Sequence, residues 1–288
     1  MIKLDRQIIM QKTALMGELK SLLLTVDGSI YSEGAIKEAM LFAKSCGIKL
    51  TLLYVKGLSK GFESGGMTVF EKPDVKLEDY FDKIREDAAE ENVELDIVIR
   101  HAEEPFSGII EEAEERRADV IIMGRRGMTG LKRLMMGSVT AKVIAYAGCK
   151  VLVVPKDADV KGERIMLATD GSKCSKIAEI EAISMAKRCP HVKSFVAVSV
   201  APSSDKLDGA KLILDRIKQT CAKESVAVET LALVGEPYKA IVNASLETNS
   251  DIVVMGTHGR TGLGRLIMGS VAERVVALSQ CSTLVVKD

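Results

Sequence analysis

The most constraining feature of this sequence is that it repeats itself. The segment GRRGMTGLKRLMMGS begins at Gly124, and a closely similar segment, GTHGRTGLGRLIMGS, begins at Gly256. From these two glycines onward, 17 of 31 aligned residues are identical. The stretches SLLLTVDGS and RIMLATDGS correspond in the same way nearer the start of each copy. A period this long indicates two duplicated domains rather than a solenoid of small units.

The repeat also places the domain boundaries. We expect a first domain over residues 18–156 and a second over residues 162–288, joined by a short charged linker. Residues 1–17 are predicted to form an N-terminal arm or short helix that packs on the body or on a partner. The offset between the copies falls from 143 residues at their starts to 132 at the glycine segments, so the first copy carries 11 more residues. These are expected in an exposed loop between residues 56 and 76, which is rich in Gly, Ser and Pro.

Within each copy, apolar runs of strand length alternate with helical patterns. The runs of the first copy are LLLTV, KLTLLYV, LDIVIR, DVIIMG and KVLVV, and helices are predicted over residues 77–91 and 106–117 and from Ser138 onward. Continuous Val, Ile and Leu runs are typical of parallel strands that are buried on both faces. Right-handed crossovers between such strands produce a doubly wound sheet. The predicted fold class is therefore α/β, with two tandem doubly wound domains flanked by helices.

Composition narrows the classes of partner. The 40 basic and 40 acidic residues balance, so no bulk electrostatic field favours nucleic acid or an anionic membrane, and neither is an expected partner. Arg125, Arg126, Lys132 and Arg133 form a local basic cluster that could contact anions. No apolar run approaches the length of about 20 residues that a membrane span requires, and charges interrupt the apolar N-terminus, which argues against a signal peptide. The six cysteines lack metal-site spacing and are expected to be small buried hydrophobic residues in a reducing cytoplasm.

The glycine segments have the features of an anion-binding turn. Each follows a predicted buried strand, and its final Gly-Ser opens a helix, whose N-terminus offers unpaired N–H groups and a partial positive charge. Ser138 and Ser270 can cap these helices or donate a hydroxyl to phosphate, and Ser270 with Glu273 has the spacing of a capping box. Neither segment is a Walker A loop or a Rossmann fingerprint. A plain strand–helix turn remains the alternative, although it explains only one or two of the glycines.

The pattern Gly-x2-Gly-x9-Gly-Ser after the fourth strand, with Asp at the end of the first strand, resembles the ATP-binding type of universal stress protein. The resemblance covers nearly the whole chain, twice. It implies a five-stranded parallel sheet of order 3-2-1-4-5 in each domain, so that the ends of strands 1 and 4 flank one crevice. It also implies an adenine nucleotide, ATP or AMP with or without Mg²⁺, as the ligand. No catalytic residue and no metal ligand of the protein are expected.

The resemblance assigns roles residue by residue. Asp27 and Asp170 would contact the adenosine part, although each could instead cap the following helix. Val55 and Val200 would lie against adenine and offer backbone groups to its edge. The phosphates would be cradled in the first copy by Gly124, Gly127, Gly137, Ser138 and the N–H group of Val139, and in the second copy by Gly256, Gly259, Gly269, Ser270, Arg260 and the N–H group of Val271.

The two copies differ at positions that affect phosphate binding. Arg260 of the second copy can reach phosphate, whereas the first copy has Met128 there. Gly235 of the second copy corresponds to Glu103, which costs free energy if the turn needs a positive φ and which repels phosphate. His258, a lone histidine with no partnered nucleophile, is interpreted as a ligand contact or an exposed side chain. We expect the second site to bind nucleotide more tightly.

Three functions remain open at this stage. The leading one is a cytoplasmic stress or regulatory module that binds adenine nucleotide. The second is a slow ATPase or a nucleotidyl-transfer enzyme of the same α/β class, although no general base recurs in both copies. The third is a module that binds only a protein partner. The final strands KVLVVP and STLVVKD lie at sheet edges that invite pairing, so the repeats are expected to pair there as an internal pseudo-dimer, and whole chains are expected to form a homodimer.

Overall fold

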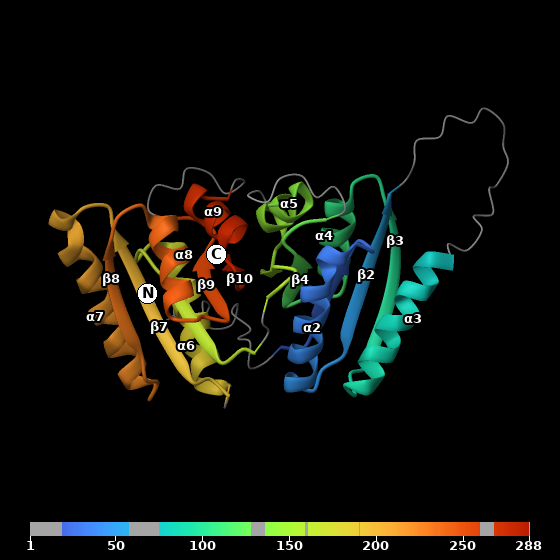
Figure 1. The fold of residues 1–288 in the computed structure, drawn as a ribbon, viewed down its shortest axis with the longest axis horizontal. Helices are drawn as coiled ribbons and strands as arrows, with labels where there is room; N and C mark the ends of the chain where they lie inside the picture. The colour runs from blue at the N-terminus through green and yellow to red at the C-terminus, as the bar shows by residue number, and fades with distance from the viewer. Residues whose placement is uncertain are drawn as a thin grey trace, which may run out of the picture.

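The computed structural model describes residues 19–57, 75–127, 136–158, 161–189, 191–259 and 268–287. Two α/β halves, one from each sequence repeat, lie side by side (Figure 1). The expected N-terminal arm, most of the expected loop over residues 56–76, and both Met128 and Arg260 lie outside the described residues.

The first half alternates strands and helices as the sequence pattern predicts. Its strands are β1 (Leu22–Val26), β2 (Leu50–Gly57), β3 (Leu95–Ala102), β4 (Val120–Gly124) and β5 (Lys150–Val154). Its helices are a short 3-10 turn η2 (Ile30–Ser32), α2 (Glu33–Cys46), α3 (Val75–Glu90), α4 (Pro105–Glu115) and α5 (Ser138–Tyr146). Strands β1, β4 and β5 are buried along their whole length, which is the reason for their continuous apolar sequences.

The second half repeats this order. Its strands are β6 (Arg164–Ala168), β7 (Ser194–Ala201), β8 (Glu229–Val234), β9 (Ile252–Gly256) and β10 (Ser282–Val286). Its helices are α6 (Lys173–Arg188), η3 (Ser204–Lys206), α7 (Leu207–Lys223), α8 (Pro237–Glu247) and α9 (Ser270–Leu278). Each half therefore has the α/β composition expected for a doubly wound domain.

The described strands form one 10-stranded sheet in the order β3-β2-β1-β4-β5-β10-β9-β6-β7-β8. Within each half the strands are parallel, and the order is 3-2-1-4-5. The expected fold class is confirmed. In both halves the first and fourth strands are neighbours, so the winding reverses between them.

Helices cover both faces of the sheet, and each face has its own hydrophobic core. One core contains Leu22 and Leu24 of β1 and lies under α2, α3, α6 and α7. The other contains Leu23 and lies under α4, α5, α8 and α9. Successive side chains of a strand point to opposite faces, so a single apolar strand supplies both cores.

The two halves join through their last strands. Strands β5 and β10 pair in antiparallel register, with Leu152 opposite Leu284, and the expected pairing of the two final strands is confirmed. Pairing removes two apolar edges that would otherwise present unpaired backbone groups. One contact across this junction is a buried ion pair, in which Lys150 Nζ lies 2.9 Å from both carboxylate oxygens of Glu181. At the corresponding position on the other side, Ser282 donates a hydrogen bond to Glu38.

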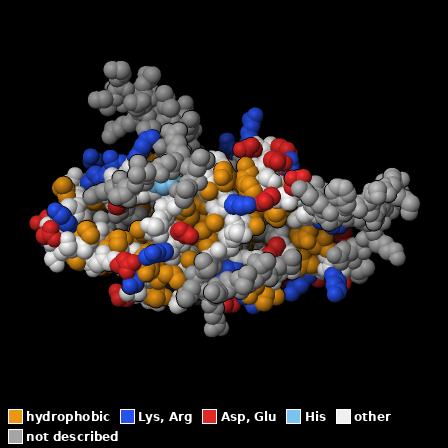
Figure 2. All heavy atoms as spheres, turned by 90° about the horizontal axis from the view of Figure 1, so that it is seen from above, with side chains coloured by type: hydrophobic (Ala, Val, Ile, Leu, Met, Phe, Trp, Pro, Cys, Tyr) orange, Lys and Arg blue, Asp and Glu red, His pale blue; other side chains and the backbone are white. Residues whose placement is uncertain are grey.

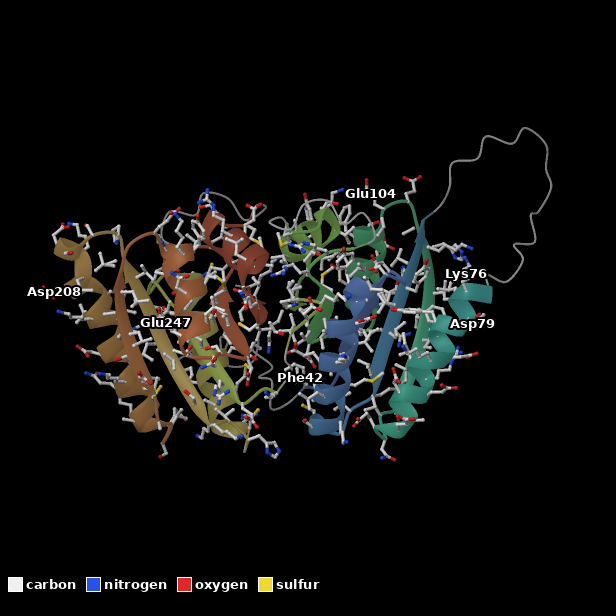
Figure 3. All side chains as sticks on the ribbon, viewed as in Figure 1. Phe42, Lys76, Asp79, Glu104, Asp208 and Glu247 are labelled. Atoms are coloured by element: carbon white, nitrogen blue, oxygen red, sulfur yellow. The ribbon has the colours of Figure 1, made fainter. Side chains whose placement is uncertain are left out.

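Charged side chains are spread over the outside. On the face in Figure 2, acidic and basic side chains are interspersed with hydrophobic ones. In Figure 3, Asp208 on α7 and Lys76 and Asp79 on α3 lie at the two far ends of the molecule. In the part of the chain that the structure describes, no helix is long and apolar enough to span a membrane.

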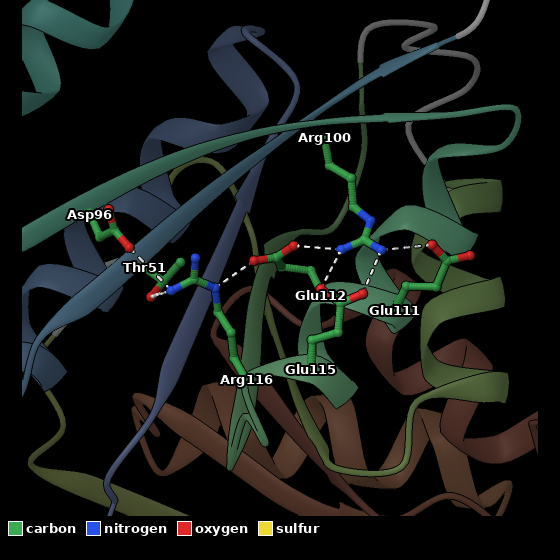
Figure 4. A network of polar contacts seen from close by, with 7 residues as sticks. All are labelled: Thr51, Asp96, Arg100, Glu111, Glu112, Glu115 and Arg116. Carbon is green, nitrogen blue, oxygen red and sulfur yellow. Dashed lines mark hydrogen bonds and ion pairs between the residues drawn. The ribbon is translucent and has the colours of Figure 1, made fainter.

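An ion-pair network holds α4 against β3 in the first half (Figure 4). Arg100 of β3 contacts the carboxylates of Glu111, Glu112 and Glu115. Arg116, just after α4, contacts Glu112 again and reaches Asp96 at 3.1 Å. In the second half Leu233 pairs with Val200 as Arg100 pairs with Val55, and Ala244 stands where the first half has Glu112, so the side chains at the same helix–strand contact are apolar there.

The expectation of six buried cysteines is wrong. Cys221 is buried, Cys46 is exposed, and the other four are partly exposed. Cys149 and Cys281 come closest to the expectation, since burial raises the pKa of the Cys149 thiol to about 11 and that of Cys281 to about 12.

Candidate functional site

The candidate site of each half lies where the winding of the sheet reverses. Strand β1 pairs with β4 from Leu22 opposite Val120 to Thr25 opposite Met123, and β6 pairs with β9 in the same register. Since both strands of each pair run in the same direction, their carboxyl ends meet at one edge. Ligands of open α/β sheets bind at this position.

An aspartate and a glycine meet at this edge in both halves. A Cβ atom added to Gly127 would lie 2.6 Å from Asp27 Oδ2, and one added to Gly259 would lie 2.8 Å from Asp170 Oδ2. The carboxylate therefore occupies the space that any other residue type would need. This contact brings together, twice, residues that are about 90–100 positions apart in the sequence, and it builds one wall of each crevice.

The other oxygen of each carboxylate holds the turn that follows the strand. Asp27 Oδ1 accepts hydrogen bonds from Ser29 N at 3.1 Å, Ser29 Oγ at 2.7 Å and Ser32 Oγ at 3.0 Å. Asp170 Oδ1 accepts from Ser172 N at 3.0 Å. Serines, not the aspartates, cap the helices that follow. The side chain of Ser29 caps η2, and Ser172 Oγ accepts a hydrogen bond from Ser175 N at the start of α6. The alternative interpretation of the aspartates as helix caps is thus not borne out.

The first glycine of each segment has a packing role that the sequence did not reveal. A Cβ atom on Gly124 would lie 2.7 Å from the carbonyl oxygen of Tyr31, and one on Gly256 would lie 2.8 Å from the backbone of Cys174. Tyr31 belongs to η2, which leads into α2, and Cys174 lies in the first turn of α6. Glycine is required here because strand end and helix start approach closely, whether or not a ligand is bound.

The last glycine of each segment begins a helix. Gly137 and Gly269 are the N-cap residues of α5 and α9, and their N–H groups donate to the carbonyl oxygens of Arg125 and Thr257 at 3.0 and 2.9 Å. A glycine N-cap has no side chain that could satisfy the first N–H groups of the helix. Those N–H groups include the ones of Val139 and Val271, in the first turns of α5 and α9.

The predicted capping box at Ser270 is wrong. Ser270 is the first residue inside α9 rather than its N-cap, and Glu273 N donates to the carbonyl oxygen of Gly269 at 3.0 Å. The extended backbone that an N-cap needs occurs one residue earlier, at Gly269, whose φ and ψ are −64° and 142°. Ser138 and Ser270 are exposed as a result, with hydroxyl groups facing outward at the helix N-termini.

The two valines lie at the ends of the second strands, on the opposite wall. Val55 of β2 and Val200 of β7 are half-buried and pack against the core under α4 and α8. Gly108 of α4 makes this packing close, since a Cβ atom there would lie 3.0 Å from Val55 Cγ1. Each valine thus offers an apolar surface beside the crevice.

The copies differ in the turn before α4 and α8. Gly235 has a φ of 139° and donates from its N–H group to the carbonyl oxygen of Ala201 at 2.9 Å. Glu103 is not among the described residues with positive φ, so the first copy avoids the strain by a different turn. His258 hydrogen-bonds through Nδ1 to Thr257 Oγ1 at 3.1 Å, and its carbonyl oxygen accepts from Ser172 Oγ at 3.4 Å.

One residue that contributes to the site had no sequence signal. Thr140 Oγ1 donates to the carbonyl oxygen of Gly124 at 3.1 Å and thereby ties the first turn of α5 to the end of β4. The second copy has Ala272 at this position. Among the residues that the structure describes, no group of three or more His, Cys, Asp or Glu side chains is arranged to hold a metal ion.

Comparison with known proteins gives a consistent result for both halves. The sequence model of the universal stress protein family matches residues 18–155 and residues 162–287. A universal stress protein of Methanocaldococcus jannaschii is 34% identical over 139 residues, which cover 43% of this chain and 82% of that protein. One from Mycobacterium bovis is 26% identical over 199 residues, 64% of this chain and 66% of that protein.

A solved structure shows the same arrangement of both halves. The crystal structure of a universal stress protein from Archaeoglobus fulgidus superposes with a TM-score of 0.69 and 22% identity. The superposition covers 93% of this chain and 98% of that one. At this level of identity the likeness concerns the fold.

Proposed function

The chain belongs to the universal stress protein family, with two domains of that family in tandem, and from this premise we propose that it binds an adenine nucleotide, ATP or AMP, in each of its two crevices. In this proposal the protein is a cytoplasmic regulatory module whose interactions change when nucleotide binds. The observation that carries the proposal is the contact of Asp27 with Gly127 and of Asp170 with Gly259 at the switch points of the sheet.

The adenosine part would lie between the aspartate and the valine of each crevice. A carboxylate accepts hydrogen bonds only, so Asp27 and Asp170 suit the hydroxyl groups of a ribose. The apolar side chains of Val55 and Val200 suit the face of adenine, and backbone groups at the strand ends suit its edge. This assignment explains why a carboxylate lies against a backbone that carries no side chain.

The phosphates would lie at the N-termini of α5 and α9. Backbone N–H groups there, a glycine N-cap and the partial positive charge of the helix favour anions. In this proposal the phosphates would contact Gly124, Gly127, Gly137, Ser138 and Val139 in the first copy, and Gly256, Gly259, Gly269, Ser270 and Val271 in the second. Arg260 is assigned to the second site from its sequence position. Mg²⁺ bound with ATP would be held mainly by the phosphates.

The direct test is to identify the nucleotide and then remove each site. Freshly purified protein is denatured and the released nucleotide is identified by chromatography. ATP and AMP are then titrated into Gly127→Ala and Gly259→Ala, whose added methyl group displaces the aspartate carboxylate. The matched control is Gly148→Ala, where an added Cβ meets no atom within 4 Å. We expect each crevice variant to lose one binding site and the control to lose none; retention of both sites in the Gly127→Ala/Gly259→Ala protein would overturn the proposal.

The enzyme alternative has its own measurement. We expect any ATP hydrolysis to be far slower than the roughly 1–1000 turnovers per second of typical enzymes. Steady-state ATP turnover of purified protein within that range, abolished by Asp170→Ala, would favour an enzyme over a binding module.

A further inference from the structure

A groove runs along one side of the junction between the two halves. It is lined by residues that follow β4 and β5 in the first half, by the start of β6, and by the turns that lead into β9 and β10 in the second half. Because β5 and β10 are antiparallel, the carboxyl end of the first half meets the amino end of the second half there. The groove has a volume of about 920 Å³, near the upper end of the range of small-molecule sites.

The groove is rich in cationic side chains contributed by both halves. Arg125 and Arg126 come from the turn after β4, Lys156 follows β5, and Lys161 and Arg164 come from the linker and the start of β6. Burial lowers the pKa of Arg125, and the positive charge of Arg126 lowers it further. Crowding like charges is unfavourable unless an anion offsets it.

Two carboxylates, Asp157 and Asp251, line the groove beside the five cations, and the charge of Asp157 opposes the lowering of the Arg125 pKa. Asp251 accepts hydrogen bonds from the backbone N–H groups of Glu163 at 2.8 Å and Arg164 at 2.9 Å, so its carboxylate stabilises the start of β6. The first half has the same arrangement, in which Asp119 accepts from the N–H groups of Lys20 and Ser21. Asp251 is therefore part of the repeated fold, and Asp157 is the other acidic residue of the lining.

The cationic residues, in contrast, are not part of the repeated fold. Each of the five aligns with one residue of the other sequence repeat. None of these aligned residues is Lys or Arg. Arg125 aligns with Thr257, Arg126 with His258, Lys156 with Asp288, Lys161 with Glu18, and Arg164 with Ser21.

The opposite side has basic residues of its own, and one of them has a structural task. Lys287 Nζ donates to the carbonyl oxygens of Ala145 and Ala147 at the end of α5, at 2.7 and 2.9 Å. Arg125 has the same role on the groove side, where its guanidinium group donates a hydrogen bond to the carbonyl oxygen of Ser279, just after α9. One cation on each side of the junction thus holds a helix C-terminus, and the groove contains four further basic residues.

We propose that this groove is a second ligand site, which binds a small molecule carrying several phosphate groups. Guanidinium and ammonium groups that converge from several segments are suited to phosphate oxygens. The site uses residues of both halves, so it exists only when β5 and β10 are paired. It borders the first nucleotide crevice, since Arg125 and Arg126 stand between Gly124 and Gly127, but its other cations follow β5 or come from the linker and the second half, and the proposal does not rest on the function proposed for the crevices.

The test is an isothermal calorimetric titration of the full chain with inorganic tripolyphosphate at low ionic strength, which measures the affinity for this probe. The variant Lys156→Gln/Arg164→Gln removes two cations that come from different halves, and we expect its affinity to be weaker by about tenfold or more. The control Lys218→Gln/Lys223→Gln removes two exposed cations of α7 and is expected to bind as the unmodified protein does. Lys161→Gln, at an exposed position, gives a second variant if the first fails to fold.

The nucleotide crevices must be separated from the groove, since they would also attract this probe. The same titration is therefore made with Gly127→Ala/Gly259→Ala, which is expected to retain the groove-dependent binding. The proposal is overturned if both groove variants bind tripolyphosphate as tightly as the unmodified protein. It is also overturned if the α7 control loses as much affinity as they do, or if only the crevice variant loses affinity.

Discussion

Glu112 is the residue on which the ion-pair network of the first half converges. Its side chain is 7% exposed, and it accepts from Arg100 Nη1 at 2.7 Å and from Arg116 Nε. We expect Glu112→Ala to lower the free energy of unfolding by about 2–3 kcal/mol, because two partly buried guanidinium groups lose a charged partner. Urea unfolding measures this change.

A neighbouring glutamate provides the control for this prediction. Glu115 contacts the same Arg100 at 2.8 Å, but its side chain is 62% exposed. Solvent screens such a pair, so Glu115→Ala should lower the free energy of unfolding much less than Glu112→Ala does. Equal effects of the two substitutions would mean that burial does not determine the strength of this network.

At the scale of elements, α2 and α6 each place a buried glutamate at the β5–β10 junction, but the two glutamates have different partners. Glu181 of α6 is fully buried and paired with Lys150 of β5. Glu38 of α2 occupies the corresponding position, but β10 offers only the hydroxyl of Ser282. Burial raises the pKa of Glu38 from 4.5 to about 7, while the hydrogen bond from Ser282 opposes the shift and the charge of Asp251 adds to it.

The raised pKa predicts a pH dependence with a definite sign. Between pH 4.5 and pH 7 the folded protein holds a proton on Glu38 that the unfolded chain releases, so the contribution of Glu38 to stability falls as the pH rises through this window. Glu38→Gln removes the titration. Relative to the unmodified protein, we expect the variant to be more stable at pH 8 than at pH 5, by up to about 3 kcal/mol. Denaturant unfolding at the two pH values checks this, and a pH-independent difference would contradict it.

The ion pair on the other side offers the reciprocal experiment. Lys150→Ser copies the Glu38–Ser282 arrangement and leaves Glu181 buried without its ammonium partner. We expect a loss of about 3–5 kcal/mol at pH 8, typical of an unpaired buried charge. The loss should be smaller at pH 5, where Glu181 can be protonated. An effect of the same size at both pH values would show that packing, rather than charge, holds α6 against β5.

For the whole molecule, we predict that the two nucleotide crevices are unequal and that the second binds more tightly. Arg260 can donate to phosphate where the first copy has Met128. Gly235 has a turn with positive φ, whereas Glu103, at the aligned position of the first copy, is not among the described residues with positive φ and carries a carboxylate. The capping box no longer supports this prediction, because Gly269 is the N-cap of α9.

The crevice variants measure this asymmetry. Gly127→Ala leaves the second site intact, and Gly259→Ala leaves the first. One charge-assisted hydrogen bond contributes roughly 1.5–3 kcal/mol, so ATP should bind to Gly127→Ala about tenfold more tightly than to Gly259→Ala. Equal dissociation constants for the two variants would show that the differences between the copies do not reach the bound nucleotide. The homodimer expected for whole chains stays a prediction, which sedimentation of the full chain can test.

The sequence by itself determined the duplication and the α/β class. Buried strands can be recognised by their mainly apolar runs, such as LLLTV and DVIIM, because a strand that is buried on both faces has few positions for a polar side chain. The strand order needed the family resemblance in addition, because apolar periodicity does not say which strands are neighbours. The edge pairing of β5 and β10 followed from the same two sources.

Only the tertiary structure decided what each motif residue does. Gly124 packs against the turn after β1, Gly127 makes room for Asp27, and Gly269 rather than Ser270 begins α9. The partner of Glu38 is Ser282, 244 positions away, and the basic groove draws on segments of both halves. These relations depend on separations of a few ångströms between residues that are distant in the chain, and such separations arise only when the packed core has fixed where each strand and helix lies.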